Sequence, residues 1–221
     1  MNILLVAATH METGLIRQHA ELADTAALQQ VYRFDASPHH CTLLHTGVGM
    51  CNTSYWLGRH LALHPCDLAI QFGIAGSFDR NLMLGDVVEL GSDCFAELGA
   101  GSPEGFLDME AMGFPVLQTP VATWYNVLQN PSAPHGSVSG ITVNCVSGAE
   151  PDISDRTSRW HAQTESMEGA AFFHAMLAAE IPFRAFRGIS NYVEPRDKSH
   201  WKIALASENA QRFVISLLKS L

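Results

Sequence analysis

Glu-Ser-Met-Glu-Gly-Ala-Ala-Phe, residues 165–172, marks the point where a short extended run gives way to a helix expected over residues 169–180. The small residues at 169–171 let the first helical turn pack closely against a sheet. Glu168, just before that turn, would point into the cleft that opens there, where a carboxylate can accept hydrogen bonds from two vicinal hydroxyls such as those of a ribose. The alternative is that Glu168 only complements the positive end of the helix dipole.

Working outward from this stretch, strand-like and helix-like segments alternate along the chain. Unbroken apolar runs of strand length predict strands covered on both faces of a sheet. Strands are expected at residues 3–8, 28–35, 41–46, 68–72, 86–94, 138–146 and 182–189. Helices are expected at residues 15–22, 52–64, 153–161, 169–180 and 199–218. The length of 221 residues, without a sharp shift in composition, predicts a single α/β domain over residues 1–221.

Two loops at the ends of expected strands are candidates for ligand binding. Glu12 follows the first strand, at the sheet edge where open α/β folds bind ligands, although a Glu beside a helix start is also an ordinary cap. The glycine-rich segment 73–77 predicts a bend that lets a flat ligand approach the backbone, or a simple turn. Residues 97–120, rich in Gly and Pro, predict an irregular excursion over an edge or an interface.

Composition excludes several classes of protein. A net charge of −9 with no local Lys/Arg cluster argues against nucleic acid as a partner. The five cysteines contain no C-x-x-C pair, which favours reduced thiols and a cytoplasmic protein. The N-terminus lacks the pattern of a secretory signal, and no run reaches the length of a membrane span.

Metal and cofactor sites are not expected. His60 and His64 share a helical face, but the H-E-x-x-H motif and a third ligand are missing. The Gly47-Val48-Gly49 segment resembles the start of a dinucleotide fingerprint, but Asn52 stands where the third glycine belongs. The G-x-S-x-G motif of many serine hydrolases is absent from the sequence, which argues against this class of enzyme. The partner that remains is a small molecule.

Six short motifs occur together in one order. They are Glu12 after the first strand, T-G-V-G at 46–49, G-I-A-G at 73–76, L-G-D-V-V at 84–88, M-E-G-A-A at 167–171 and R-G-I-S-N at 187–191. In this order they resemble the purine nucleoside phosphorylase/nucleosidase superfamily over almost the whole chain. Within it, residues 190–197 followed by Trp201 are similar to the futalosine hydrolases. The resemblance implies a three-layer fold, with a central twisted mixed β-sheet flanked by helices.

The resemblance also implies hydrolysis of an N-glycosidic bond and a role for each matching residue. Glu12 would be the general base for the attacking water, and Asn191 would hydrogen-bond the leaving purine. Glu168 would hold the ribose diol. The other implied substrate contacts are Ile74, Ala75 and Gly76 in the glycine-rich segment, Met167 against the sugar and Trp201 over the 5′ substituent. Arg196 or Lys198 would pair with a carboxylate on the substrate tail, unless both belong to a solvated charged loop.

Three other functions remain open. A phosphorylase needs cationic and hydroxyl donors for its anion, whereas the first loop offers a carboxylate. The methylthioadenosine nucleosidases carry Asp where Asn191 stands, which puts adenine specificity in doubt. A nucleoside-binding protein without enzymatic activity would lack the Glu12 base. The resemblance also predicts a homo-oligomer, a dimer or a tetramer, in which a neighbour completes the pocket.

Overall fold

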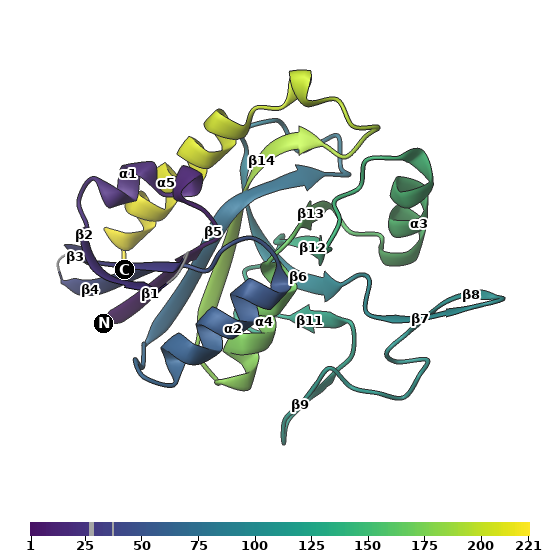
Figure 1. Cartoon of the computed structure of the whole chain (residues 1–221), viewed down its shortest axis with the longest axis horizontal. Coiled ribbons are helices and arrows are strands. Elements are labelled where there is room, and N and C mark those ends of the chain that lie inside the picture. The colour runs from purple at the N-terminus through teal and green to yellow at the C-terminus, as the bar shows by residue number, and fades with distance from the viewer. Residues whose placement is uncertain (27–28, 37) are drawn as a thin grey trace.

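A ten-stranded mixed β-sheet forms the centre of the molecule (Figure 1). The structure, a computed structural model, describes residues 1–26, 29–36 and 38–221. The strands of the sheet are β1 Asn2–Ala7, β2 Glu21–Ala26, β3 Gln29–Ala36, β4 His39–His45, β5 Leu68–Ser77, β6 Val87–Phe95, β11 Val127–Gln129, β12 Val138–Thr142, β13 Thr164–Ser166 and β14 Phe183–Tyr192. Their order is β11-β6-β12-β13-β5-β1-β4-β3-β2, and β14 pairs with both β5 and β6.

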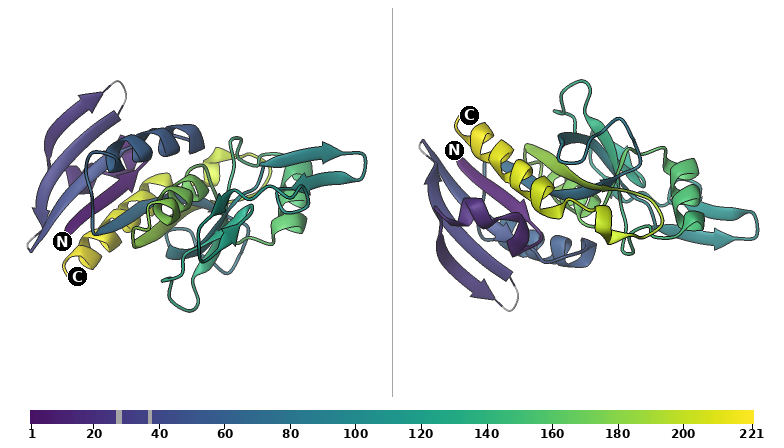
Figure 2. Two further views of the ribbon diagram at one scale, coloured as in Figure 1. Left: turned by 90° about the horizontal axis from the view of Figure 1, so that it is seen from below. Right: turned by 90° about the horizontal axis from the view of Figure 1, so that it is seen from above.

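Helices cover both faces of this sheet (Figures 1 and 2). They are α1 Gly14–Arg17, α2 Met50–Leu61, α3 Glu150–Trp160, α4 Gly169–Ala178 and α5 Ile203–Leu218, with short 3-10 turns η1 His10–Glu12 and η2 Lys198–His200. Helices α2 and α4 lie on one side of β1 and β5, whereas α1 and α5 lie on the other. This arrangement confirms the expected three-layer α/β fold.

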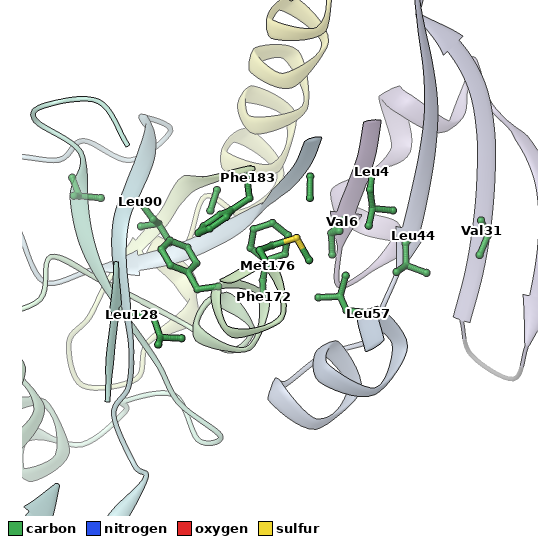
Figure 3. Packing of buried hydrophobic residues seen from close by; sticks show 14 residues of the cluster. Leu4, Val6, Val31, Leu44, Leu57, Leu90, Leu128, Phe172, Met176 and Phe183 are labelled. Carbon is green, nitrogen blue, oxygen red and sulfur yellow. The ribbon is translucent and has the colours of Figure 1, made fainter. Parts of the chain in front are cut away.

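Alternation along β1 explains why both faces are buried. Leu4 and Val6 join a core cluster with Leu57 of α2 and Phe172 of α4 (Figure 3). Ile3, Leu5 and Ala7 of the same strand belong to a second cluster, together with apolar residues of α1 and α5. Because successive side chains of a strand point to opposite faces, an unbroken apolar run supplies both clusters at once.

The two longest strands, β5 and β14, run parallel and carry their last residues to the same edge of the sheet. Their register shifts near its end: Ile189 pairs with Ala75, but Asn191 pairs with Gly76. Ser190 is therefore the extra residue of a bulge. Among the residues described, no helix is long and apolar enough to cross a membrane.

Three expectations are wrong. The helix expected at 15–22 is only the single turn α1, and the chain enters β2 at Glu21, which pairs antiparallel with β3. The bend expected at 73–77 is the continuation of β5, paired with β14 throughout. Residues 97–120 are not wholly irregular, because they form the β7–β8 hairpin, Gly99–Ser102 with Gly105–Asp108, and strand β9, Leu117–Gln118, which pairs with β10, Thr123–Trp124.

Most other expected elements are present with shifted ends. The C-terminal helix begins at Ile203 rather than at residue 199, because η2 precedes it. Helix α4 ends at Ala178 rather than at residue 180. The expected strand 28–35 includes residue 28, which lies outside the described part of the chain.

Candidate active site

A pocket of about 950 Å³ opens at the edge of the sheet where β5 and β14 end. All nine residues expected to act or bind line it: Glu12, Ile74, Ala75, Gly76, Met167, Glu168, Asn191, Arg196 and Trp201. These residues come from five separate parts of the sequence, and the fold brings them together in one pocket.

Glu12 is held in place by hydrogen bonds to both of its carboxylate oxygens. The backbone N–H and the hydroxyl of Thr9 donate to Oε2, at 2.9 and 2.8 Å. The N–H of Ile74 donates to Oε1 at 3.2 Å. Glu12 thus belongs to the capping box of η1, whose N-cap is Thr9, and also lines the pocket, so the two interpretations of this carboxylate are compatible. Its remaining lone pairs are available to a water molecule or a hydroxyl.

Gly73 leaves space for the carboxylate of Glu12. A Cβ atom at this position would lie 2.7 Å from Oε1 of Glu12, so a side chain here would push the carboxylate away. Glycine inside a strand often marks the close approach of another group. At Gly76, a Cβ atom would lie 3.1 Å from Nδ2 of Asn191. Both glycines therefore make room for pocket side chains.

Glu168 occupies the N-cap position of α4, but its carboxylate does not cap that helix. Oε1 instead accepts a hydrogen bond of 2.9 Å from the N–H of Gly49, at the start of α2. Gly49 has φ = 93°, a conformation that glycine adopts freely. Burial raises the pKa of Glu168, the Gly49 hydrogen bond opposes this shift, and the charge of Glu12 adds to it. Glu168 also lines the pocket, and a carboxylate that accepts one hydrogen bond keeps acceptor capacity for hydroxyl groups.

The neighbouring Glu165 also lines the pocket, but its oxygens are already used within the protein. Oε1 accepts from the N–H of Ser147 at 2.8 Å, and Oε2 accepts from the Ser147 hydroxyl at 2.6 Å and from Arg156 at 3.0 Å. Because Glu165 is buried and fully paired, its role is structural. Of the two carboxylates in the motif, Glu168 is therefore the one that a ligand can reach.

A buried cation lies behind the two pocket carboxylates. Arg187, only 2% exposed, donates to the backbone carbonyl of Phe186 and to the side chain of Gln71. Burial lowers the pKa of Arg187, and the charges of Asp93, Glu168 and Glu12 oppose this shift, in that order. The positive charge of Arg187 in turn opposes the rise in the pKa of Glu168 that burial causes.

Asn191 is oriented by its own neighbours. Its Oδ1 accepts from the Ser190 hydroxyl at 2.7 Å, and its Nδ2 donates to the carbonyl of Tyr192 at 2.9 Å. One amide hydrogen and one oxygen lone pair remain for a ligand. The side chain can therefore both donate and accept on the edge of a planar base.

The loop after β14 closes another side of the pocket with an aromatic ring and a cation. The guanidinium of Arg196 lies 5.2 Å from the centre of the Trp201 ring, within the range of a cation–π contact. Lys198 lies 5.9 Å from the same ring but does not line the pocket. Of the two cations considered for the substrate tail, the geometry favours Arg196.

Several pocket residues were not identified from the sequence. Helices α1 and α5 contribute a wall that includes Leu15, Gln18, Ser207 and Gln211. Buried Gln211 accepts from the N–H of Leu15 at 2.7 Å and so joins the two helices. The sequence predicted the helix at 199–218 but not its place in the pocket wall. Within the described ranges, no group of three or more potential ligands could hold a metal ion.

Comparison with known proteins identifies the family of the chain. The model of the phosphorylase superfamily matches residues 2–219. The futalosine hydrolase of Thermus thermophilus is 31% identical over 184 residues, which cover 79% of this chain and 80% of that protein.

Solved structures share the fold. A futalosine hydrolase of Helicobacter pylori matches with a TM-score of 0.83 at 12% identity, covering 100% of this chain and 98% of that one. A 5′-methylthioadenosine/S-adenosylhomocysteine nucleosidase of Colwellia psychrerythraea, in complex with adenine, matches with a TM-score of 0.81 at 18% identity, covering 100% and 96%. The chain belongs to the phosphorylase superfamily, and within it to the N-glycosyl hydrolases.

Proposed function

We propose that this protein hydrolyses futalosine to hypoxanthine and dehypoxanthine futalosine, a step of menaquinone biosynthesis. The observation that carries the proposal is the pairing of Glu12 and Glu168 in one pocket with Asn191 and Arg196. Two carboxylates and an amide suit a ribosyl group and a 6-oxopurine, and the cation suits a carboxylated tail. The similarity to the Thermus thermophilus futalosine hydrolase supports this choice of substrate.

The reaction requires a water molecule that attacks C1′ as the bond between C1′ and the purine breaks. Glu12 accepts the proton of that water, and the bonding electron pair leaves with the purine, which takes up a proton at N7 from solvent. Glu168 accepts hydrogen bonds from the 2′ and 3′ hydroxyls as positive charge develops on the ribose. A positioned general base contributes roughly 10²- to 10⁴-fold to such a rate.

Phosphorolysis is the main rival reaction, and the charges of the pocket argue against it. A phosphate ion would lie beside the carboxylates of Glu12 and Glu168. In the part of the chain that the structure describes, Arg196 is the cationic residue that lines the pocket. It lies beside Trp201 and forms no ion pair with a described carboxylate. Hydrolysis therefore fits the pocket better.

The decisive experiment incubates the purified protein with futalosine, with and without inorganic phosphate, and follows free hypoxanthine. We expect the same rate under both conditions. Release that depends on phosphate would instead indicate a phosphorylase. Faster cleavage of methylthioadenosine or aminofutalosine than of futalosine would indicate the nucleosidase alternatives.

Asn191 provides the test of base preference. Its free amide hydrogen can donate to O6 of hypoxanthine, and its oxygen can accept from a protonated N7. Asp in its place can deliver a proton to N7 and accept from an adenine amine. Asn191→Asp should therefore shift kcat/KM toward aminofutalosine by about 1 to 3 kcal/mol, the range of a good bidentate base contact.

Arg196 and Lys198 form a matched pair for testing the tail. Both lie near Trp201, but only Arg196 lines the pocket. If Arg196 pairs with the tail carboxylate, Arg196→Ala raises KM for futalosine, whereas Lys198→Ala leaves it nearly unchanged. Equal effects of the two substitutions would show that the carboxylate is read elsewhere.

A further inference from the structure

The first turn of helix α4 is capped by a residue of strand β12. Glu168 stands at the N-cap position, where a side chain usually accepts from the N–H two or three residues later. Here the N–H of Ala170, two residues after Glu168, donates instead to the hydroxyl oxygen of Thr142 at 2.8 Å. Thr142 ends β12 and is fully buried. Glu168 is thus relieved of the capping bond that its position would otherwise favour.

Asp93 fixes the direction of the Thr142 hydroxyl. Thr142 donates its hydrogen to Oδ1 of Asp93 at 2.7 Å, which leaves its oxygen lone pairs free to accept from Ala170. The N–H of Cys94 also donates to Oδ1, at 2.8 Å. Asp93, Thr142 and Ala170 are buried. The three groups form one chain of hydrogen bonds from β6 through β12 to α4.

The backbone around Asp93 is shaped to admit its carboxylate. A Cβ atom at Gly169 would lie 1.8 Å from Oδ2 of Asp93, and one at Gly140 would lie 3.1 Å from it. Oδ2 itself has no hydrogen-bond partner among the described residues. Burial raises the pKa of Asp93 to about 6, although the nearby charge of Arg187 opposes the shift. A carboxylate buried in this way is costly to stability, so stability alone does not explain it.

We propose that Thr142 and Asp93 are positioning residues for the glycosidic reaction. They supply the cap of α4, so the carboxylate of Glu168 stays bonded to Gly49 and directed into the pocket. Without the Thr142 hydroxyl, the N–H of Ala170 loses its acceptor, and the Glu168 side chain stands at the N-cap position, from which it can replace that acceptor. The inference rests on the proposed function in that Glu168 is the group that holds the ribose hydroxyls.

The test compares wild type with Thr142→Val, which keeps the shape and removes the hydroxyl, on futalosine and on its 2′-deoxy analogue. We expect kcat/KM for futalosine to fall about 10- to 100-fold, the scale of a misplaced binding group. Loss of the 2′ hydroxyl should slow the wild-type enzyme strongly but slow the variant little further. Thr142→Ser, which keeps the hydroxyl, should stay within a few-fold of wild type.

A second pair of variants separates loss of the hydroxyl from loss of folding. Thr142→Ala and Thr142→Ser both remove the methyl group and differ only in the hydroxyl, and a thermal melt of each variant shows whether it is folded. If a folded variant without the hydroxyl keeps the full dependence on the 2′ hydroxyl, Thr142 is merely structural and the inference is overturned. Failure of the wild-type protein to cleave futalosine would refute the proposed substrate instead. The same comparison can then be made on the nucleoside that the protein does cleave.

Discussion

Glu12 and Glu168, the two pocket carboxylates proposed to act on the substrate, are positioned in opposite ways. Glu12 takes two of its three hydrogen bonds from Thr9, three residues earlier in the same turn. Glu168 takes its bond from Gly49, 119 residues away. Thr142, 28 residues before Ala170 in the sequence, accepts the hydrogen bond of the Ala170 N–H, so the Glu168 side chain does not have to cap the helix. A local turn thus presets one carboxylate, whereas the assembled sheet places the other. Perturbing the sheet should therefore affect the diol contact more than the base.

Removing the charge of the locally held carboxylate should have the largest effect. Glu12→Gln keeps the shape but removes the base, so we expect kcat to fall by roughly 10²- to 10⁴-fold while folding and product binding stay nearly intact. Steady-state kinetics and product titration measure both properties. Turnover within a few-fold of wild type would mean that Glu12 is only the cap of η1.

Removing the charge of the remotely held carboxylate should have a somewhat smaller effect. Glu168→Gln weakens charge-assisted bonds to two hydroxyls, so we expect kcat/KM to fall by about 10²- to 10³-fold. Burial raises the pKa of Glu168. The ionised form of Glu168 is needed for binding the hydroxyls. As the pH is lowered, wild-type activity should therefore begin to fall at a pH above the usual titration range of a Glu. A pH profile of the wild type that lacks this early acid limb would contradict the assignment.

Asp93 belongs to the sheet-based support of Glu168, and its ionisation should change the free energy of unfolding. Its folded pKa of about 6 lies above its ordinary value of 3.8, so the native state binds the proton more tightly than the unfolded chain does. The stability from this group is full below pH 3.8 and is lost as pH rises through 6.

Urea unfolding of wild type and Asp93→Asn between pH 4 and 7 measures this loss. The free energy of unfolding of the wild type should fall relative to the variant by about 2 to 3 kcal/mol over that range, at about 1.4 kcal/mol per pKa unit. A difference that does not change with pH would show that the Asp93 pKa is not raised in the folded state.

The smallest effect should come from weakening the local turn. Thr9→Val removes the hydroxyl that donates to Oε2 of Glu12 but keeps the backbone N–H of residue 9 and that of Ile74. Loss of one hydrogen bond of about 0.5 to 1.5 kcal/mol should slow turnover by about two- to tenfold. A loss larger than that of Thr142→Val would reverse the comparison, because the local turn would then be the more fragile support.

Sequence patterns predicted the layers of the fold well, since unbroken apolar runs such as β1 need cover on both faces. The same patterns failed where tertiary pairing overrides local preference. Residues 21–26 form a strand because β3 lies beside them, and no pattern within the segment reveals that neighbour. Gly73 and Gly76 suggested a bend, whereas their lack of side chains serves Glu12 and Asn191, which lie far away in sequence.

The nine residues expected at the site line one pocket, because their motifs follow strands that end at one sheet edge, whereas their roles rest on the family resemblance and stay predictions. The sequence did not predict the hydrogen bonds that hold the site residues in position. Asp93 and Thr142 stand in ordinary strand segments without a motif, and their link to α4 appears only when β6, β12 and α4 are brought together. The pocket wall from α1 and α5 was missed for the same reason.

The bulge at Ser190 makes chain length, as well as residue identity, a determinant of where the Asn191 side chain lies. Side chains of a strand alternate between faces, so the extra residue inverts the parity of everything after it. Deleting Ser190, the one residue between Ile189 and Asn191, would remove the bulge together with the hydroxyl that donates to Asn191, so we expect the amide to turn toward the opposite face. Relatives of this enzyme that differ by a single insertion or deletion here should therefore differ in which side chain meets the purine.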